Sequence, residues 1–266
     1  MAANRNQVIA SAAGTLEILE ALGDAPGPVT LGHVVGATGR PKGTVHRMLS
    51  TLVHTGFARQ DPASGRYSLT LKAWRIGSAT LRDLDLVKIA LPVLDKLVEE
   101  AGETVHLAVL DPSGTAVYVA RVESARSVRV QTRLGQMNPT WCTATGRAML
   151  AFHPEVAELV LERPLERRTP KTVTDRRRIR ESLAEVRAQG YAVTLAENHP
   201  EIGGIAAPVR DHAGEVVAAC GIGVPAFRMD AAYIQREIPL VLRAAARISA
   251  ALGYSEHSFR STAHAA

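Results

Sequence analysis

The pattern that most constrains the fold is a helix-length apolar stripe followed at once by a short hairpin, between residues 39 and 71. Apolar residues recur at the 3.6-residue period of a helix, at Val45, Met48, Leu49, Leu52 and Val53. We expect this face to be buried. Pro41 suits the first helical turn, where its missing N–H costs no hydrogen bond, and Gly56 ends the helix. The opposite face of this helix is therefore open to a partner.

Two further helices are predicted before this one. Apolar residues fit one amphipathic helix over residues 8–23, and a shorter helix over residues 30–39 begins at Thr30, a residue type that caps helix N-termini. After the third helix, residues 57–60 and 66–69 flank a turn at residues 61–65, which predicts a hairpin. Together these elements predict a winged helix-turn-helix domain over residues 1–71.

The open face of the third helix has the residue types that contact DNA. The first residues of a recognition helix reach base edges and phosphates in the major groove. Gly43 would let the backbone approach the nucleic acid, and Arg47 is the best candidate for a bidentate base contact. The candidate DNA contacts are Arg40, Lys42, Gly43, Thr44, His46, Arg47, Ser50, Thr51, Arg59 and Arg66. The last two of these lie on the predicted hairpin. A small three-helix module with a merely solvated polar face stays open as an alternative.

Charge supports a nucleic-acid partner for the first part of the chain. The chain has a net charge of +5 at pH 7. Residues 1–83 contain nine Lys or Arg against five Asp or Glu, so most of the basic excess lies there. Because the salt-dependent phosphate contribution scales with the number of neutralised charges, one copy would bind weakly. We therefore expect two copies on a two-fold DNA site.

The rest of the chain predicts a linker helix over residues 72–86 and an α+β domain over residues 87–254. A helix at residues 86–101 contains Pro92, which predicts a kink or a start there. The expected strand pairs and later helices lie at residues 104–110 with 116–122, 204–210 with 216–223, and 143–152, 155–161, 175–189 and 231–252. One antiparallel sheet flanked by helices is the simplest arrangement. Residues 255–266 are expected to form a disordered tail.

The motifs Arg-Pro-Lys-Gly-Thr-Val-His-Arg-Met-Leu, Thr-Leu-Val-x-x-Gly-Phe and Gly-Arg-Tyr-x-Leu begin at Arg40, Thr51 and Gly65. This arrangement resembles the IclR family of bacterial transcription regulators, and the similarity covers nearly the whole chain. The resemblance implies a ligand-responsive regulator with a GAF-like effector domain, bound to a palindromic operator as a homodimer or dimer of dimers. Family members usually have Ser at the position of Gly43, so a hydroxyl contact is absent here.

The resemblance also implies an effector pocket built from residues 139–151, 190–197, 204–209 and 219–225. The implied effector-binding residues are His106, Trp141, Cys142, Thr143, Ala144, Thr145, Thr194, Glu197, Gly204, Ile205, Gly221 and Gly223. Relatives usually carry Cys or Ser at three of these glycines, so we expect a larger and less polar space than a pocket for glyoxylate or pyruvate. The segment at residues 141–147 is similar to the family branch that senses aromatic acids, which makes an aromatic catabolite the leading candidate.

Each pocket residue also has a plain structural interpretation. Trp141 could be packing, Glu197 could pair with Arg147, and His106 could be a buried core histidine. The glycines of the last segment could relieve crowding within a strand. The basic run at residues 176–180 is typical of a solvated helix face rather than a second nucleic-acid site.

Other classes of protein are disfavoured. No apolar run approaches the roughly 18 residues of a membrane-spanning helix, and no signal-peptide core is present, so a cytoplasmic location is expected. Cys142 and Cys220 lack metal-ligand spacing, and we expect no metal, cofactor or catalytic residue. An enzyme using Cys142 with His106 or His199 would need an oxyanion site that the sequence does not supply. A constitutive DNA-binding protein whose second domain only oligomerises stays open.

Overall fold

The computed structural model describes residues 9–82 and 85–255 of the 266-residue chain. The described residues divide into a first compact unit that ends at Arg82 and a second that begins at Asp85. The start of the first expected helix, at Val8, lies outside the described residues, as does the expected tail after Ser255. The domain boundaries expected from the sequence stay predictions.

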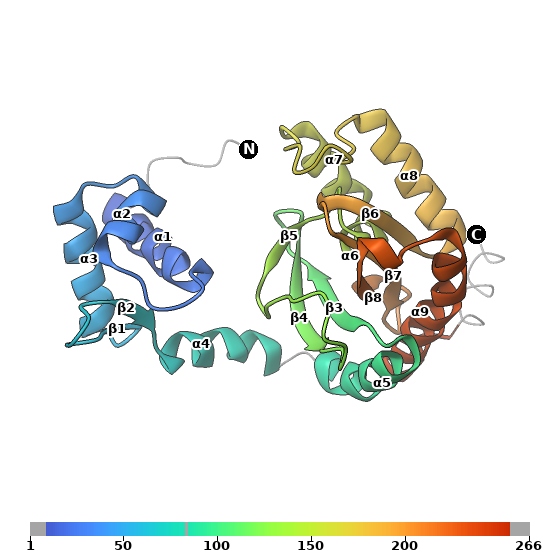
Figure 1. Ribbon diagram of the computed structural model, residues 1–266, viewed down its shortest axis with the longest axis horizontal. Helices are drawn as coiled ribbons and strands as arrows, with labels where there is room; N and C mark the ends of the chain where they lie inside the picture. The colour runs from blue at the N-terminus through green and yellow to red at the C-terminus, as the bar shows by residue number, and fades with distance from the viewer. Residues whose placement is uncertain (1–8, 83–84, 256–266) are drawn as a thin grey trace. The chain divides into compact units, whose positions relative to one another are not determined.

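The first unit contains the expected three helices and hairpin, followed by a fourth helix (Figure 1). Its elements are α1 (Ala10–Asp24), α2 (Leu31–Thr38), α3 (Lys42–His54), β1 (Ala58–Gln60), β2 (Tyr67–Leu69) and α4 (Leu71–Arg82). The strands β1 and β2 pair antiparallel. An antiparallel bridge between Val29 and Tyr67 ties the hairpin to the segment before α2. The prediction of a winged helix-turn-helix is confirmed.

Capping residues mark both ends of α2. The Thr30 hydroxyl accepts a hydrogen bond from the N–H of His33 at 3.3 Å, which caps α2 as expected. Gly39 ends α2 in the left-handed region, at φ 63°, where a side chain would be strained. The core of the unit is formed by Ile18, Leu22, Val29, Val34, Val45, Leu49, Leu52, Ala58 and Tyr67.

The buried stripe on α3 is narrower than the sequence predicts. Val45, Leu49 and Leu52 are buried, and Met48 is half-buried against the same core. Val53 was expected on this face and is 36% exposed. It stands about 100° around the helix from Leu52, at the margin of the stripe, so that expectation was wrong.

The second unit consists of a six-stranded antiparallel sheet with helices on both faces (Figure 1). Its helices are α5 (Asp85–Ala101), α6 (Ala144–Leu150), α7 (Pro154–Glu162), α8 (Arg176–Gln189) and α9 (Ala231–Ala251), with a 3₁₀ turn at Ala226–Arg228. Its strands are β3 (Thr104–Leu110), β4 (Thr115–Val122), β5 (Met137–Pro139), β6 (Ala192–His199), β7 (Ile202–Arg210) and β8 (Val216–Pro225). Pro92 lies inside α5 rather than at its start.

The strand order is β5-β4-β3-β8-β7-β6, so the two expected hairpins lie side by side through the β3–β8 pair. Helices α5 and α9 pack together and against the sheet on one face, while α6 packs on the other face beneath α7 and α8 (Figure 1). The edge strands β5 and β6 were not expected as strands. The prediction of an α+β fold with one antiparallel sheet is confirmed.

Candidate functional site

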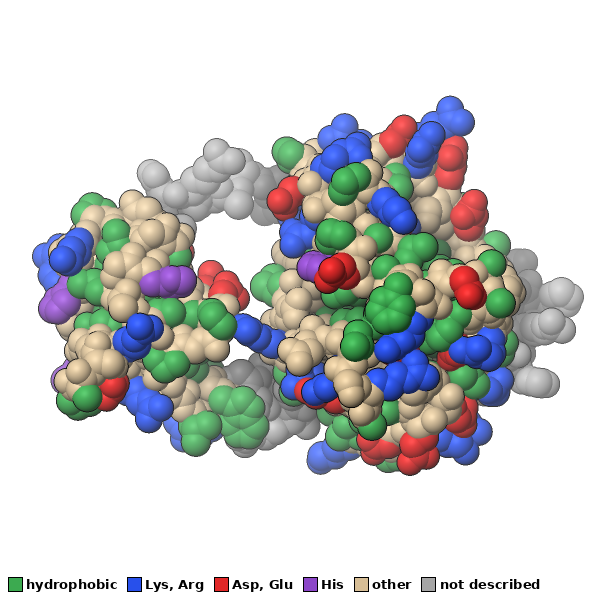
Figure 2. Space-filling model, in the orientation of Figure 1, with side chains coloured by type: hydrophobic (Ala, Val, Ile, Leu, Met, Phe, Trp, Pro, Cys, Tyr) green, Lys and Arg blue, Asp and Glu red, His purple; other side chains and the backbone are tan. Residues whose placement is uncertain are grey.

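The outer face of α3 is exposed and basic. Lys42, Gly43, His46 and Arg47 are all exposed, and Thr44 is half-buried. Figure 2 shows Lys, Arg and His side chains at the edge of the first unit where α3 lies. A Cβ added at Gly43 would have no heavy atom within 4 Å, so the backbone there is open to a partner. This face has the shape and charge of a DNA-contacting surface.

Ser50 and Thr51 lie one turn further along the same helix. The Ser50 hydroxyl donates to the carbonyl of His46 at 2.9 Å, and the Thr51 hydroxyl donates to the carbonyl of Arg47 at 3.0 Å. A hydroxyl that donates to its own helix still has lone pairs for a partner's donor. Both side chains stay exposed and within the surface expected from the sequence.

Arg40 differs from the other candidate contacts because it is part of the fold. Its guanidinium lies 2.7 Å from a carboxylate oxygen of Glu17 on α1. A Cβ at Gly14 would lie 2.8 Å from the same guanidinium, so a glycine there leaves room for it. Arg40 therefore links the turn before α3 to α1, and only the N–H groups that do not pair with Glu17 remain for a partner.

The two hairpin arginines are anchored in part. Arg59 donates from Nε to the Ser68 hydroxyl at 3.1 Å, and Arg66 donates from Nη1 to the carbonyl of Pro28 at 3.1 Å. Each guanidinium carries five N–H donors, so most remain for phosphate oxygens. Both side chains are exposed.

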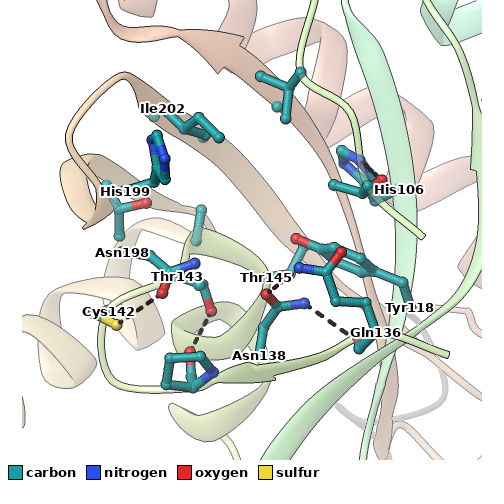
Figure 3. A pocket seen from close by; sticks show the side chains of 18 of the residues that line it. His106, Tyr118, Gln136, Asn138, Cys142, Thr143, Thr145, Asn198, His199 and Ile202 are labelled. Atoms are coloured by element: carbon teal, nitrogen blue, oxygen red, sulfur yellow. Dashed lines mark hydrogen bonds between the residues drawn. The ribbon is translucent and has the colours of Figure 1, made fainter. Parts of the chain in front are cut away.

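The second unit contains a cavity of about 400 Å³ between the sheet and the start of α6 (Figure 3). His106, Tyr118 and Gln136 stand on one side of it, and Cys142, Asn198 and His199 on the other, with Thr143 and Thr145 between them. Eight of the residues implied by the family resemblance line it, namely His106, Cys142, Thr143, Ala144, Thr145, Thr194, Gly204 and Gly223.

Four implied residues do not line this cavity. Trp141 is half-buried and packs against the core beside α6, and Ile205 is fully buried on the strand face opposite Gly204. A Cβ at Gly221 would lie 2.6 Å from the carbonyl oxygen of Ile205, so that glycine serves close strand packing. Glu197 points instead to a buried partner.

That partner is Arg147 on α6. Its Nη1 donates to Glu197 Oε1 at 2.9 Å, Nη2 pairs with the second oxygen, and Nε donates to the carbonyl of Trp141 at 2.8 Å. Both side chains are almost fully buried. The fork of Arg147 therefore satisfies the Glu197 carboxylate and fixes the segment before α6, which is the structural interpretation left open by the sequence.

A kink in β6 explains why Glu197 and Asn198 face different surroundings. The β6–β7 register shifts between Leu195 and His199, and Ala196 has a φ of 57°. The Thr169 hydroxyl holds this kink by donating to the carbonyl of Ala196 at 2.6 Å. As a result, Glu197 turns to Arg147 while Asn198 and His199 line the cavity.

Most side chains around the cavity are hydroxyls, amides or imidazoles, so the cavity is polar. The expectation of a space less polar than a pocket for glyoxylate or pyruvate stays a prediction. The glycines also leave little spare room. A Cβ at Gly223 would lie 2.9 Å from His106, and one at Gly204 would lie 3.2 Å from the carbonyl oxygen of Ile222. The space of the cavity is set by the surrounding elements rather than by missing side chains.

Sequence reasoning missed over half of the cavity lining. The missed residues are Tyr118, Val130, Gln131, Thr132, Gln136, Met137, Asn138, Arg168, Asn198, His199, Ile202 and Gly203, whereas Pro139 and Ile222 lie within the implied pocket segments. Alternation along the β3–β4 hairpin offered one signal, because Tyr118 pairs with Ala108 and so shares a face with His106. Arg168 comes from the loop between α7 and α8, for which the sequence offered no signal.

The rings of His106 and Tyr118 form a stacked wall, with centroids 4.6 Å apart and an interplanar angle of 19°. Burial, with a smaller effect of Arg121, lowers the pKa of His106 to about 3, so the imidazole is neutral at pH 7. Its Nε2 lies 2.8 Å from the Thr132 hydroxyl. Burial raises the pKa of the Tyr118 phenol. The wall is therefore uncharged and aromatic.

Thr145 offers an unused hydrogen-bonding group to this cavity. Its hydroxyl oxygen is buried without a partner at hydrogen-bond distance, although it is near enough to the Tyr118 phenol to offset slightly the rise in that pKa. Burying a hydroxyl without a partner costs free energy, so a polar group of a ligand would stabilise it. Among the described residues that line the cavity, Arg168 is the one Lys or Arg.

The cavity is poorly suited to nucleophilic chemistry. Burial raises the pKa of the Cys142 thiol to about 12, which keeps it protonated, and the thiol lies 3.8 Å from the side-chain oxygen of Asn198. Cys142 and Cys220 are buried and form no disulfide. Within residues 9–82 and 85–255, no cluster of His, Cys, Asp or Glu could hold a metal ion, and no helix is long and apolar enough to span a membrane.

Comparison with known proteins finds matches to both units of the chain. The model of the IclR helix-turn-helix domain matches residues 11–62, and that of the bacterial transcriptional regulator IclR C-terminal domain matches residues 78–250. The chain is 33% identical to the HTH-type transcriptional regulator KdgR of Escherichia coli over 220 residues, covering 82% of this chain and 83% of KdgR. It is 30% identical to the transcriptional repressor IclR of the same organism, covering 90% and 88%.

A solved structure is similar over both units. An IclR homologue from Microbacterium hydrocarbonoxydans, crystallised in complex with 4-hydroxybenzoate, superposes with a TM-score of 0.76 at 27% identity, covering 92% of this chain and all of that one. These relatives are transcriptional regulators rather than enzymes. The chain therefore belongs to the IclR family of bacterial transcriptional regulators.

Proposed function

We propose that this IclR-family regulator binds a palindromic operator through α3 and changes its affinity for that operator when a small organic acid occupies the cavity. The observation that carries the proposal is the pairing, in one chain, of an exposed basic helix face with a polar cavity containing an unpartnered buried hydroxyl. A bacterial regulator of this kind acts on DNA in the cytoplasm.

Arg47 is the proposed base-reading residue. It is exposed at the second turn of α3. Its contact with Thr51 uses its backbone carbonyl and not its guanidinium. A planar guanidinium on a recognition helix suits the two acceptors of a guanine edge. Lys42 and the helix start beside Gly43 would contact phosphates.

The proposed effector is an aromatic or otherwise bulky organic acid. The stacked rings of His106 and Tyr118 offer a flat wall, and Arg168 supplies the positive charge for a carboxylate. The Arg168–Glu166 contact at 3.3 Å is solvent-exposed, so exchanging Glu166 for a ligand carboxylate costs little. The complex of a homologue with 4-hydroxybenzoate supports this class of ligand.

The DNA-binding part of the proposal is tested by comparing two arginine variants. Arg47→Ala should lower affinity for the operator upstream of the protein's own gene by about 10- to 100-fold, because a bidentate base contact contributes roughly 1–3 kcal/mol. Arg177→Ala removes an 87% exposed arginine from α8 and should leave operator affinity unchanged. Affinity is measured by fluorescence anisotropy at fixed salt. Equal affinities of the Arg47 variant and the parent protein would reject α3 as the base-reading element.

The effector part is tested with a panel of aromatic and aliphatic acids that includes 4-hydroxybenzoate. A member that binds should raise the melting temperature and shift operator affinity in the same protein. Arg168→Gln should weaken its binding without changing operator affinity in its absence. If no acid binds, the proposed effector class is wrong, and the constitutive alternative is favoured.

A further inference from the structure

A second cavity of about 550 Å³ adjoins the first one in the second unit. It lies between the segment at residues 128–131, the β6–β7 turn and the end of β8. Val130, Gln131, His199 and Ile202 line both cavities, so the two spaces lie next to each other. We call them the inner cavity, around Thr145, and the outer cavity, around Phe227.

The two cavities differ in chemistry. The inner cavity is mostly polar, whereas the outer cavity is lined mainly by apolar groups with Arg129 and Glu201 among them. Phe227 is 75% exposed and Val128 is 55% exposed, both in the outer cavity. Figure 2 shows hydrophobic side chains exposed beside Lys and Arg side chains on the visible face of this unit. Covering an exposed phenyl ring with an apolar part of a ligand is favourable, because it removes apolar surface from water.

The walls of the outer cavity are held in place by one buried carboxylate. Glu103 is fully buried and pairs with Arg126 and with Arg228, whose Nη1 lies 2.9 Å from Glu103 Oε1. Arg228 also donates from Nη2 to the carbonyl of Val128 at 3.0 Å. The loop with Val128 and the turn with Phe227 are thus tied to the same anchor. A preformed site binds without the cost of ordering its walls.

We propose that the outer cavity binds the apolar tail of the effector while its polar head occupies the inner cavity. The effector is then an amphiphilic acid with an alkyl or aryl extension, rather than a compact acid that fills the inner cavity alone. This inference rests on the proposed function, because it assigns a second subsite to the same ligand. Four lining residues shared with the inner cavity place the outer cavity within reach of a ligand bound there, and this assigns it to a ligand tail rather than to another protein.

The experiment measures binding of benzoate and 4-alkylbenzoates, from methyl to hexyl, to the full-length protein by titration calorimetry. Affinity should rise about fourfold for each added methylene that enters the outer cavity, because burying apolar area is favourable. Phe227→Ala should lower affinity for hexylbenzoate by about tenfold and leave benzoate unchanged. The Phe227 ring contacts Arg228, which Glu103 holds independently, so this variant should keep the cavity walls.

Val217→Ala is the matched control, since Val217 is a 37% exposed apolar residue of β8 outside both cavities. It should reproduce the parent protein across the series. Two results would overturn the outer subsite while leaving the proposed function intact. One is benzoate binding with no gain for longer tails, and the other is the same gain in the Phe227 variant.

Two further outcomes decide against the subsite for other reasons. If no acid of any length binds, the proposed effector class is wrong and the subsite is rejected with it. If Phe227→Ala instead weakens self-association in sedimentation experiments without changing any acid affinity, a second copy of the chain covers the outer cavity.

Discussion

At the residue scale, the charge state of His106 couples stability to pH. Its pKa falls from 6.5 to about 3 on folding. At pH values between these two, the unfolded chain therefore binds one proton more than the folded chain. Its contribution is present above pH 6.5 and is lost as pH falls from there toward 3. Between pH 7.5 and 5 the free energy of unfolding should fall by roughly 2 kcal/mol from this group.

The measurement is urea unfolding followed by Trp141 fluorescence in a Trp74→Phe background, because the chain contains two tryptophans. His106→Gln should remove this part of the pH dependence. An unchanged slope between pH 7.5 and 5 in the glutamine variant would show that the imidazole is not buried in its neutral form.

The Arg147–Glu197 pair is a second feature of the residue scale. Glu197→Gln leaves the buried guanidinium without its charge partner and should lower the free energy of unfolding by about 3 kcal/mol, measured in the same fluorescence assay. Glu181→Gln breaks the exposed pair with Arg177 and should change stability little. Comparable losses in the two variants would contradict a structural role that depends on burial.

Some of the residues that line the cavity could be predicted from the sequence, and others could not. Segments next to a recognisable motif, such as Cys142 to Thr145, were found because they are contiguous in sequence. Gln136 and Arg168 were not, because they reach the cavity from an edge of the sheet and from a loop, and only the tertiary fold brings them there. Glu197 was expected in the pocket from the family resemblance, and only the tertiary fold brings its carboxylate to the buried Arg147 instead.

At the element scale, α4 exposes large apolar residues that a single copy leaves uncovered. Leu71 and Trp74 lie one turn apart and are 82% and 70% exposed. Exposed apolar patches of this kind are typical of interfaces, and the modest charge of the first unit already calls for two copies on DNA. We therefore expect α4 to lie in the interface between two chains.

Trp74→Glu should raise the dimer dissociation constant at least about tenfold, as expected for an aromatic residue at the centre of an interface, and should weaken operator binding with it. Sedimentation velocity measures the association. Leu159→Glu, on the 38% exposed Leu159 of α7, is the control and should sediment like the parent protein. An unchanged dimer in the Trp74 variant would place the interface elsewhere.

Elements with a strong period were predictable, and short or irregular ones were not. The apolar stripe of α3 and the turns of both large hairpins are each formed by residues within one short segment of the sequence, so they are local signals. The strand β5 has three residues and ends in Pro139, and β6 is broken by its kink, so neither carries a clear alternation. Both are edge strands that form by pairing with a neighbour.

At the scale of the whole molecule, the proposed function requires that ligand and DNA affect one another equally. If an acid changes the operator dissociation constant by some factor, operator DNA must change the acid dissociation constant by the same factor. Coupling in allosteric proteins is typically about 5- to 150-fold. Anisotropy gives the first factor, and titration calorimetry on operator-saturated protein gives the second.

Agreement of the two factors would establish coupling between the first and second units without any assumption about how they are arranged. Arg168→Gln is the matching control, because it should shift the acid concentration needed without changing operator affinity in the absence of acid. Two factors equal to one, for an acid that binds, would mean that occupation of the cavity does not regulate DNA binding.

The open space around Gly43 has a consequence for how such a regulator can change its target. A serine, or any small side chain, can be added there without displacing a neighbouring atom, because none lies within 4 Å. A change at this position therefore need not affect folding, whereas a side chain added at Gly221 would meet the backbone of Ile205 and Ala206. If Gly43 faces the operator as proposed, a library randomised at this position should change operator specificity while the protein still folds.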